Sequence, residues 1–360
     1  MYLWGFVIIL NMRKLGAVVI VLLLCLQAEA QINRNAIKKN NKKIGSYRGT
    51  SNTFGRTKAY SGIGFSVNAL NYYGDLAPTP KRVSTDISFT RPGFGGSFFH
   101  RFGPRYTVMG QLMVGTLRGS DGESADKNDP ENGVYRYKRN LSFKNTIKEL
   151  SVTFVFDLFK NDGNYMSRVK WTPYVFVGVA GFLQQPKGLA PATDPTGAAL
   201  DDAGKWVKLR PLGTEGQYAD LQPGDANYGI KPYSLIQVAI PFGIGARLKL
   251  TETLDLWADI GFRYTFTDYL DDVSRNYVDL GVLKTPLAKA MSYRTGELGL
   301  PTSTHQYVGR DGVTYTVEAG YGEENPSNNR GSKADKDVYM VTSIRLTHII
   351  GATYHKAKFR

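Results

Sequence analysis

The stretch Leu254–Thr267 reads LDLWADIGFRYTFT, and apolar side chains occupy every second position. In an extended strand successive side chains point to opposite faces, so Leu256, Ile260 and Phe262 share one face. Asp255 and Arg263 fall on the other. The pattern predicts a β-strand with one apolar face and one polar, partly charged face.

The same alternation recurs along the chain. It predicts eight strands, at about 60–72, 91–102, 105–118, 147–158, 171–183, 234–249, 253–268 and 337–349. The gaps between them alternate long and short, as in outer-membrane barrels, which have short periplasmic turns and long external loops. A closed barrel in lipid covers every apolar face and leaves no open edge. We therefore expect an all-β, antiparallel transmembrane β-barrel in the outer membrane of a Gram-negative cell.

Two alternatives stay open at this stage. A soluble β-sandwich fits the same composition. A barrel of ten strands is also possible, because Gln306–Val308 and Val313–Val317 flank a turn sequence within 269–336.

The N-terminus is predicted to be an export signal. Arg13 and Lys14 precede an apolar run over 15–26, and Ala28-Glu29-Ala30 forms a cleavage motif, so residues 1–30 are typical of a secretory signal peptide. An uncleaved anchor is the alternative. Cys25, the only cysteine, lies within this run, so we expect no disulfide and no thiol chemistry in the mature chain.

The formal net charge of +14 is concentrated near the two ends. Residues 31–59 contain no acid and are predicted to form a disordered basic arm, and 351–360 a basic tail, flanking a barrel over 60–350. An even number of strands places both ends in the periplasm. We expect the arm to dock on a periplasmic protein partner of an envelope complex or on anionic membrane lipid, and not on nucleic acid. The candidate docking residues are Arg34, Lys38, Lys39, Lys42, Lys43 and Arg48.

Charged residues of both signs fall on the inward faces of the predicted strands. They are Glu149, Asp157, Arg247, Lys249, Asp255, Asp259, Arg263 and Arg345. Eight strands leave an interior just wide enough for side chains to fill. A lumen closed by salt bridges is therefore expected, with a conducting or ligand-binding lumen as the alternative.

No arrangement of residues points to catalysis. The four histidines are dispersed, and neither a nucleophile elbow, a zinc-binding His pair nor a phosphate loop occurs. The acidic stretch 121–133 lacks the spacing of a calcium loop and is expected to be a solvated loop. We expect no catalytic, cofactor-binding or metal-binding residues.

Three segments resemble a known family. Asn71–Leu76 closes the first strand, Gly93-Phe94-Gly95 and Gly119-Ser120-Asp121 bracket the second hairpin, and Thr267–Val273 closes the seventh strand. Together with the terminal Lys358-Phe359-Arg360 they resemble the PorG-like outer-membrane β-barrel family of Bacteroidetes. The family-motif residues are Tyr72, Tyr73, Gly74, Asp75, Leu76, Asp268, Tyr269, Leu270, Asp271 and Asp272.

The resemblance implies a non-enzymatic barrel that anchors an envelope complex, as in the type IX secretion system, where such a barrel is associated with a periplasmic ring. A second hypothesis is a surface-binding barrel whose long loops, 184–233 and 269–336, recognise an external ligand or matrix. A small porin or transporter is the third.

Overall fold

The computed structural model describes residues 54, 58–77, 89–299 and 303–350. The signal peptide (1–30), the tail (351–360) and all six candidate docking residues of the arm lie outside them. So does the arm itself, apart from residues 54, 58 and 59.

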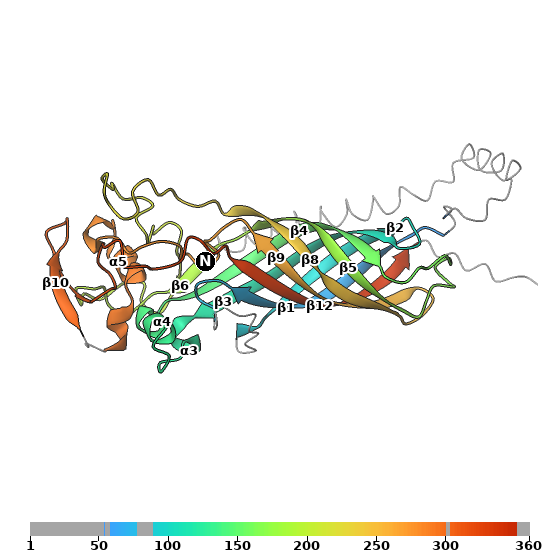
Figure 1. Cartoon of the computed structure of the whole chain (residues 1–360), viewed down its shortest axis with the longest axis horizontal. Coiled ribbons are helices and arrows are strands. Elements are labelled where there is room, and N and C mark those ends of the chain that lie inside the picture. Colours follow the sequence, from blue (N-terminus) through green and yellow to red (C-terminus); the bar gives the residue numbers. More distant parts are fainter. Residues whose placement is uncertain (1–53, 55–57, 78–88, 300–302, 351–360) are drawn as a thin grey trace, which may run out of the picture. The chain divides into compact units, whose positions relative to one another are not determined.

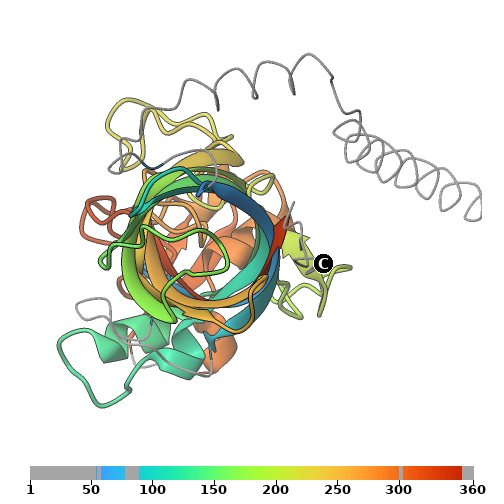
Figure 2. The same cartoon turned by 90° about the vertical axis from the view of Figure 1, so that its right-hand side faces the viewer.

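Eight antiparallel strands close into a barrel (Figures 1 and 2). They are β1 (Tyr60–Tyr73), β2 (Arg91–Arg101), β3 (Tyr106–Ser120), β4 (Ser142–Asp157), β5 (Trp171–Leu183), β8 (Ile236–Lys249), β9 (Leu254–Thr265) and β12 (Val338–Ile350). Each pairs with the next along the chain, and β12 pairs with β1 to close the ring. All eight predicted strands are confirmed, and so is the fold class.

The barrel wall carries an apolar outer belt. Phe65 on β1, Leu112 on β3 and Ile244 on β8 each expose more than half of their surface. Along each strand, such outward-facing residues alternate with residues that point into the barrel. Aromatic rings border the belt near the short turns, where Phe102 stacks on Tyr106 at 6.1 Å and Phe159 meets Trp171 at 5.2 Å. Such a belt with an aromatic border is the surface that a bilayer requires of a β-barrel.

The two ends of the barrel differ as the gap lengths predict. Short turns join β2 to β3 and β8 to β9 at one end, where Ser61 pairs with both Ile350 and His100. The start of β1 and the end of β12 therefore lie beside the short turns. The four long loops leave from the opposite end (Figure 1).

The described parts of the long loops form a folded structure that we call the outer cap: residues 74–77, 89–90, 121–141, 184–235, 266–299 and 303–337. Its helices are α3 (Asp121–Ser124), α4 (Gly133–Arg139), η3 (Leu280–Val282), α5 (Pro286–Ser292) and η4 (Thr295–Leu298). Its strands are β6 (Pro186–Leu189), β7 (Trp206–Lys208), β10 (Thr304–Val308) and β11 (Thr314–Glu318). Among the described residues, no helix is long and apolar enough to span a bilayer.

The hairpin suspected within 269–336 exists but does not enlarge the barrel. Strands β10 and β11 pair only with each other, with Tyr307 opposite Tyr315. Tyr315 is buried in an apolar cluster within the cap, which holds the hairpin above the barrel. The ten-strand alternative is therefore wrong.

Candidate functional site

The lumen is crossed by buried ion pairs. Of the eight charged residues predicted to face it, all but Lys249 are buried. Asp157 on β4 accepts hydrogen bonds from Arg247 on β8 at 2.6 Å and from Arg101 on β2 at 2.8 Å. These three side chains connect strands on different sides of the barrel near its short-turn end.

A second group lies deeper in the lumen. Asp259 is 3.4 Å from Arg345 and accepts a hydrogen bond from Tyr174 at 2.9 Å. Glu149 accepts one from Tyr339 at 2.7 Å and is 3.5 Å from Arg263. Every carboxylate in the predicted set therefore has a basic or hydroxyl partner.

Two of the predicted residues lie near the short turns and have partners that the sequence did not indicate. Asp255 is bound at 2.7 Å by Arg168, which comes from the turn before β5 and reaches into the barrel end. Lys249 is only half-buried and donates to the carbonyl oxygen of Met166 instead of to a carboxylate. Its ammonium reaches the turn at the rim.

Aromatic side chains fill most of the remaining interior. Trp257 is fully buried, and the Arg247 guanidinium lies 4.8 Å from the centre of its ring. A cavity between Tyr174, Trp257 and Arg345 measures about 10 Å³. A cavity of this size holds about one water molecule.

At the opposite end of the barrel, a tyrosine joins the cap to the wall. Tyr72, near the end of β1, has its hydroxyl 2.8 Å from an oxygen of Asp271 and 2.6 Å from an oxygen of Asp337. Gly74 permits this approach, because a Cβ there would lie 2.0 Å from the Tyr72 hydroxyl and 2.1 Å from Asp337. The two family-motif segments, distant in sequence, therefore meet at one place.

The carboxylates at this place are far from water. Burial raises the pKa of Asp271 well above its ordinary value, and the neighbouring Asp337 raises it further. Burial likewise raises the pKa of Asp337, with Asp268 and Asp75 adding to the effect. Because two buried carboxylates share one phenolic proton donor, an additional proton is favoured on the pair. Among the described residues, no three His, Cys, Asp or Glu side chains are placed to hold a metal ion together.

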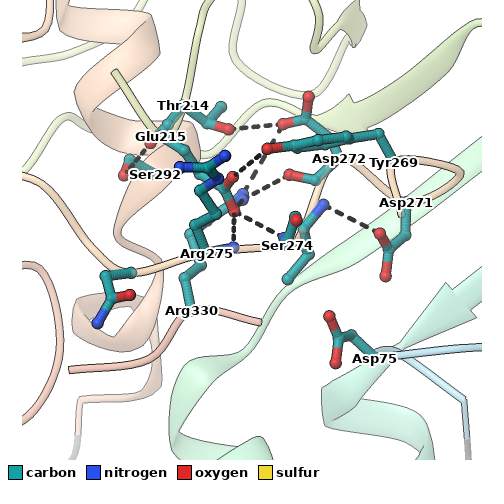
Figure 3. A network of polar contacts seen from close by, with 12 residues as sticks. Asp75, Thr214, Glu215, Tyr269, Asp271, Asp272, Ser274, Arg275, Ser292 and Arg330 are labelled. Carbon is teal, nitrogen blue, oxygen red and sulfur yellow. Dashed lines mark hydrogen bonds and ion pairs between the residues drawn. The ribbon is translucent and has the colours of Figure 1, made fainter. Parts of the chain in front are cut away.

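Glu215 is the centre of a second network, drawn in Figure 3. One of its oxygens accepts from the backbone amides of Ser274 and Arg275, at 2.8 and 3.1 Å, and from the Arg330 guanidinium at 3.0 Å. The other accepts from the Tyr269 hydroxyl at 3.2 Å. A fully buried carboxylate thereby holds loop 184–235 against loop 266–337.

Asp272 completes this network. Its backbone is in the left-handed region, with φ of 69°, and its carboxylate accepts from Thr214 and Tyr233, each at 2.6 Å. Burial raises the pKa of Asp272 to about 6, although Arg330 lowers it. Strained backbone of this kind persists where the surroundings over-determine it.

The remaining family-motif residues lie around these two networks. Leu76 and Leu270 are buried in the apolar cluster between barrel and cap, whereas Tyr73 contacts Phe262 at the rim. Tyr269 stacks on Tyr233 at 4.6 Å. Asp268 accepts from Ser274 at 2.6 Å, and burial raises its pKa to about 7.

Loop 121–141 is held by a buried ion pair instead of being a fully solvated acidic loop. Arg139 on α4 binds Asp121 through two nitrogens, at 2.8 and 2.9 Å, and donates to the backbone oxygens of Asp75 and Arg330. Beside this contact, between α4 and residues 319–332, lies a cavity of about 450 Å³. Its lining includes Arg136, Arg139 and Arg330.

The sequence did not single out Arg101, Arg168, Glu215, Arg330 or Asp337. Arg101 is the last residue of a glycine-rich strand, and Arg168 is in a turn. Glu215 and Arg330 are in loops without periodicity, where no pattern indicates which charges become buried. Asp337 is the first residue of the predicted strand 337–349, which in the structure begins one residue later, at Val338.

Comparisons with known proteins give one family match and several similar solved structures. The model of a family described as a domain of unknown function (DUF6089) matches residues 54–194. No curated protein matches the chain.

Three of the solved structures to which the chain is similar are the following. Ail, the attachment invasion locus protein of Yersinia pestis, has 6% identity and a TM-score of 0.33, with 81% of this chain and 99% of that chain covered. Neisserial surface protein A has 7% identity and a TM-score of 0.32, covering 81% and 97%. OprG of Pseudomonas aeruginosa has 9% identity and a TM-score of 0.33, covering 82% and 98%.

The closed sheet and its apolar belt define the class of this protein. A barrel whose outer wall is apolar and whose lumen is polar is stable with lipid outside, and such barrels occupy outer membranes. The chain is an outer-membrane β-barrel.

Proposed function

We propose that this protein is a non-enzymatic, non-conducting outer-membrane barrel that serves as a structural anchor in an envelope complex. The observation that carries the proposal is the closed lumen, where Asp157 bridges Arg101 and Arg247. Moving an ion past these buried ion pairs would require breaking them, which is costly. A barrel built in this way holds a position in the membrane instead of passing solutes.

The complex that we favour is the type IX secretion system. Two features support this choice: the resemblance of 71–76 and 267–273 to the PorG-like family, and the basic ends of the chain, which strand parity assigns to the periplasm. Under this proposal, Arg34, Lys38 and the other basic residues of the arm dock on an acidic surface of a periplasmic partner.

Reconstitution and co-purification test the proposal. Planar bilayers containing the purified barrel should show no steady channels, and nanosiemens-scale conductance would instead support the porin hypothesis. Separately, replacing the six candidate docking residues with Gln should remove a periplasmic protein that co-purifies with the wild type. Replacing the loop lysines Lys231, Lys284 and Lys333 with Gln is the control for lost charge. Unchanged partners in the arm variant would contradict the docking proposal.

A second candidate function is recognition of a surface ligand by the outer cap. The 450 Å³ cavity favours it, because a mixed apolar and polar cavity with Arg136, Arg139 and Arg330 in its wall suits a ligand that carries an anionic group. Tyr135 at the cavity is 59% exposed, so Tyr135→Ala should leave the fold intact. Loss of surface adhesion in this variant with normal secretion would support recognition over anchoring.

A further inference from the structure

An apolar groove crosses the outer wall of the barrel from the middle of β1 to the cap-side end of β5. Its volume is about 660 Å³, and Phe65 and Phe94, stacked at 6.3 Å, form part of its wall. Gly96 and Gly181 line it, and a Cβ added at either would meet nothing within 4 Å.

The groove follows one row of the sheet. Phe65 pairs with Gly96, Gly96 with Leu112, Leu112 with Leu150, and Leu150 with Gly181. Two members of this outward-facing apolar row are glycines, which leaves space at the level of the membrane. Because the belt is surrounded by hydrocarbon, the space suits an acyl chain.

Basic residues form a second row above the groove, on the same side of the barrel. Arg118 on β3 pairs with Lys144 on β4, Lys144 with Lys187 on β6, and Lys187 with Lys208 on β7. Neighbouring strands are about 4.8 Å apart, and like charges directly opposite one another destabilise a sheet. Four cations in register therefore cost stability unless an anion lies across them.

The acids near this row neutralise only one of its four cations. Glu123 pairs with Arg118 alone, and Asp202 pairs with Lys205. Within the described part of the chain, no carboxylate forms an ion pair with Lys144, Lys187 or Lys208.

The same face has features of a membrane interface. The Lys144 ammonium lies 5.8 Å from the centre of the Trp206 ring, and Trp is typical of the membrane–water boundary. Lys148, exposed on the same face of β4, lines the groove itself. It is four residues from Lys144, or roughly 13 Å along the strand.

We propose that this face binds a phosphorylated, acylated lipid of the outer leaflet. One acyl chain lies in the groove over Gly96 and Gly181, and the phosphates engage Lys148 and the row above it. The long-loop end of the barrel faces outward, so the row is at the headgroup level of the outer leaflet. Basic residues at this depth attract anionic headgroups.

Native mass spectrometry of the full-length barrel with lipid A as the probe tests the proposal. The wild type should retain lipid A and not the zwitterionic phosphatidylcholine. The triple variant K144Q/K187Q/K208Q should bind lipid A on the order of 100-fold more weakly, since each basic residue contributes roughly fivefold. The matched control K231Q/K284Q/K333Q removes three exposed cap lysines and should bind as the wild type does.

The groove is tested separately. The variant G96L/G181L fills open space on the lipid-facing wall, so it should fold and yet lose retained lipid A. Gly110→Leu is the matched control, because Gly110 also has nothing within 4 Å of a Cβ and does not line the groove. Undiminished binding in either test variant would overturn the proposal. Equal binding of phosphatidylcholine, or inorganic phosphate bound as tightly as lipid A, would overturn the assignment to a phosphorylated lipid.

Discussion

The hydroxyl of Tyr72 lies 2.6 Å from the carboxylate of Asp337, and the same hydroxyl lies 2.8 Å from Asp271. A phenol has one proton to donate, so it satisfies one carboxylate at a time. The other requires a proton of its own or remains a buried, unsatisfied charge. This arrangement connects the first strand of the barrel to both ends of the last long loop.

Tyr72→Phe should weaken the attachment of the cap by about 1–3 kcal/mol, because two buried carboxylates lose their shared donor. Asp337→Asn should instead stabilise the cap at pH 8, since the amide donates to the pair and removes one charge. Hydrogen exchange of the Leu270 amide, which donates to Asp337 at 2.8 Å, reports on the contact. An Asn variant less stable than the Phe variant would contradict the shared-proton interpretation.

The stability of the cap should fall as pH rises from about 4 to about 7. Burial raises the folded-state pKa of Asp272 to about 6, above the value near 3.9 of an unfolded chain. The folded state therefore binds more protons in this window, and stability present below pH 4 is lost as Asp272 ionises. The loss amounts to roughly 3 kcal/mol.

Asp272→Asn is the variant that checks this pH dependence. Asn tolerates the positive φ of 69° and keeps an acceptor for Thr214 or Tyr233, but it does not titrate. Hydrogen exchange of the Ser274 and Arg275 amides, corrected for intrinsic rates, should show a shallower pH slope in this variant. A slope equal to that of the wild type would assign the effect to other groups.

Two ion pairs in the cap should differ in their contribution to stability. Glu215→Gln leaves the Arg330 guanidinium, which is 2% exposed, without its main partner, and should cost roughly 3–5 kcal/mol. Arg310→Gln removes a cation whose side chain is 40% exposed and should cost less than about 1 kcal/mol. The rate of protease cleavage within 184–235, measured for both variants, compares their stability directly. Similar cleavage rates would contradict the prediction that the two ion pairs differ.

The sequence predicted the barrel better than the cap because period-two alternation is local. That Leu256, Ile260 and Phe262 lie on one face of a strand can be predicted from this short segment alone. The Glu215–Arg330 pair joins positions separated by 115 residues, in loops with no repeating pattern. The family-motif segments were identified by their resemblance to a family, and the contact between Tyr72 and Asp271 depends on a register that only the closed barrel sets.

Glycine at position 74 should be required for the junction of barrel and cap. A Cβ at Gly74 would lie 2.0 Å from the Tyr72 hydroxyl and 2.1 Å from Asp337, so Gly74→Ala should cost about 1–3 kcal/mol by overpacking. Gly96→Ala is the matched control, since its Cβ meets nothing within 4 Å. Denaturant midpoints of the two variants give the comparison.

The double variant G74A/Y72F should cost less than the sum of the two single changes, because removing the hydroxyl removes the nearest clash. Additive costs would mean that Gly74 acts through something other than this contact.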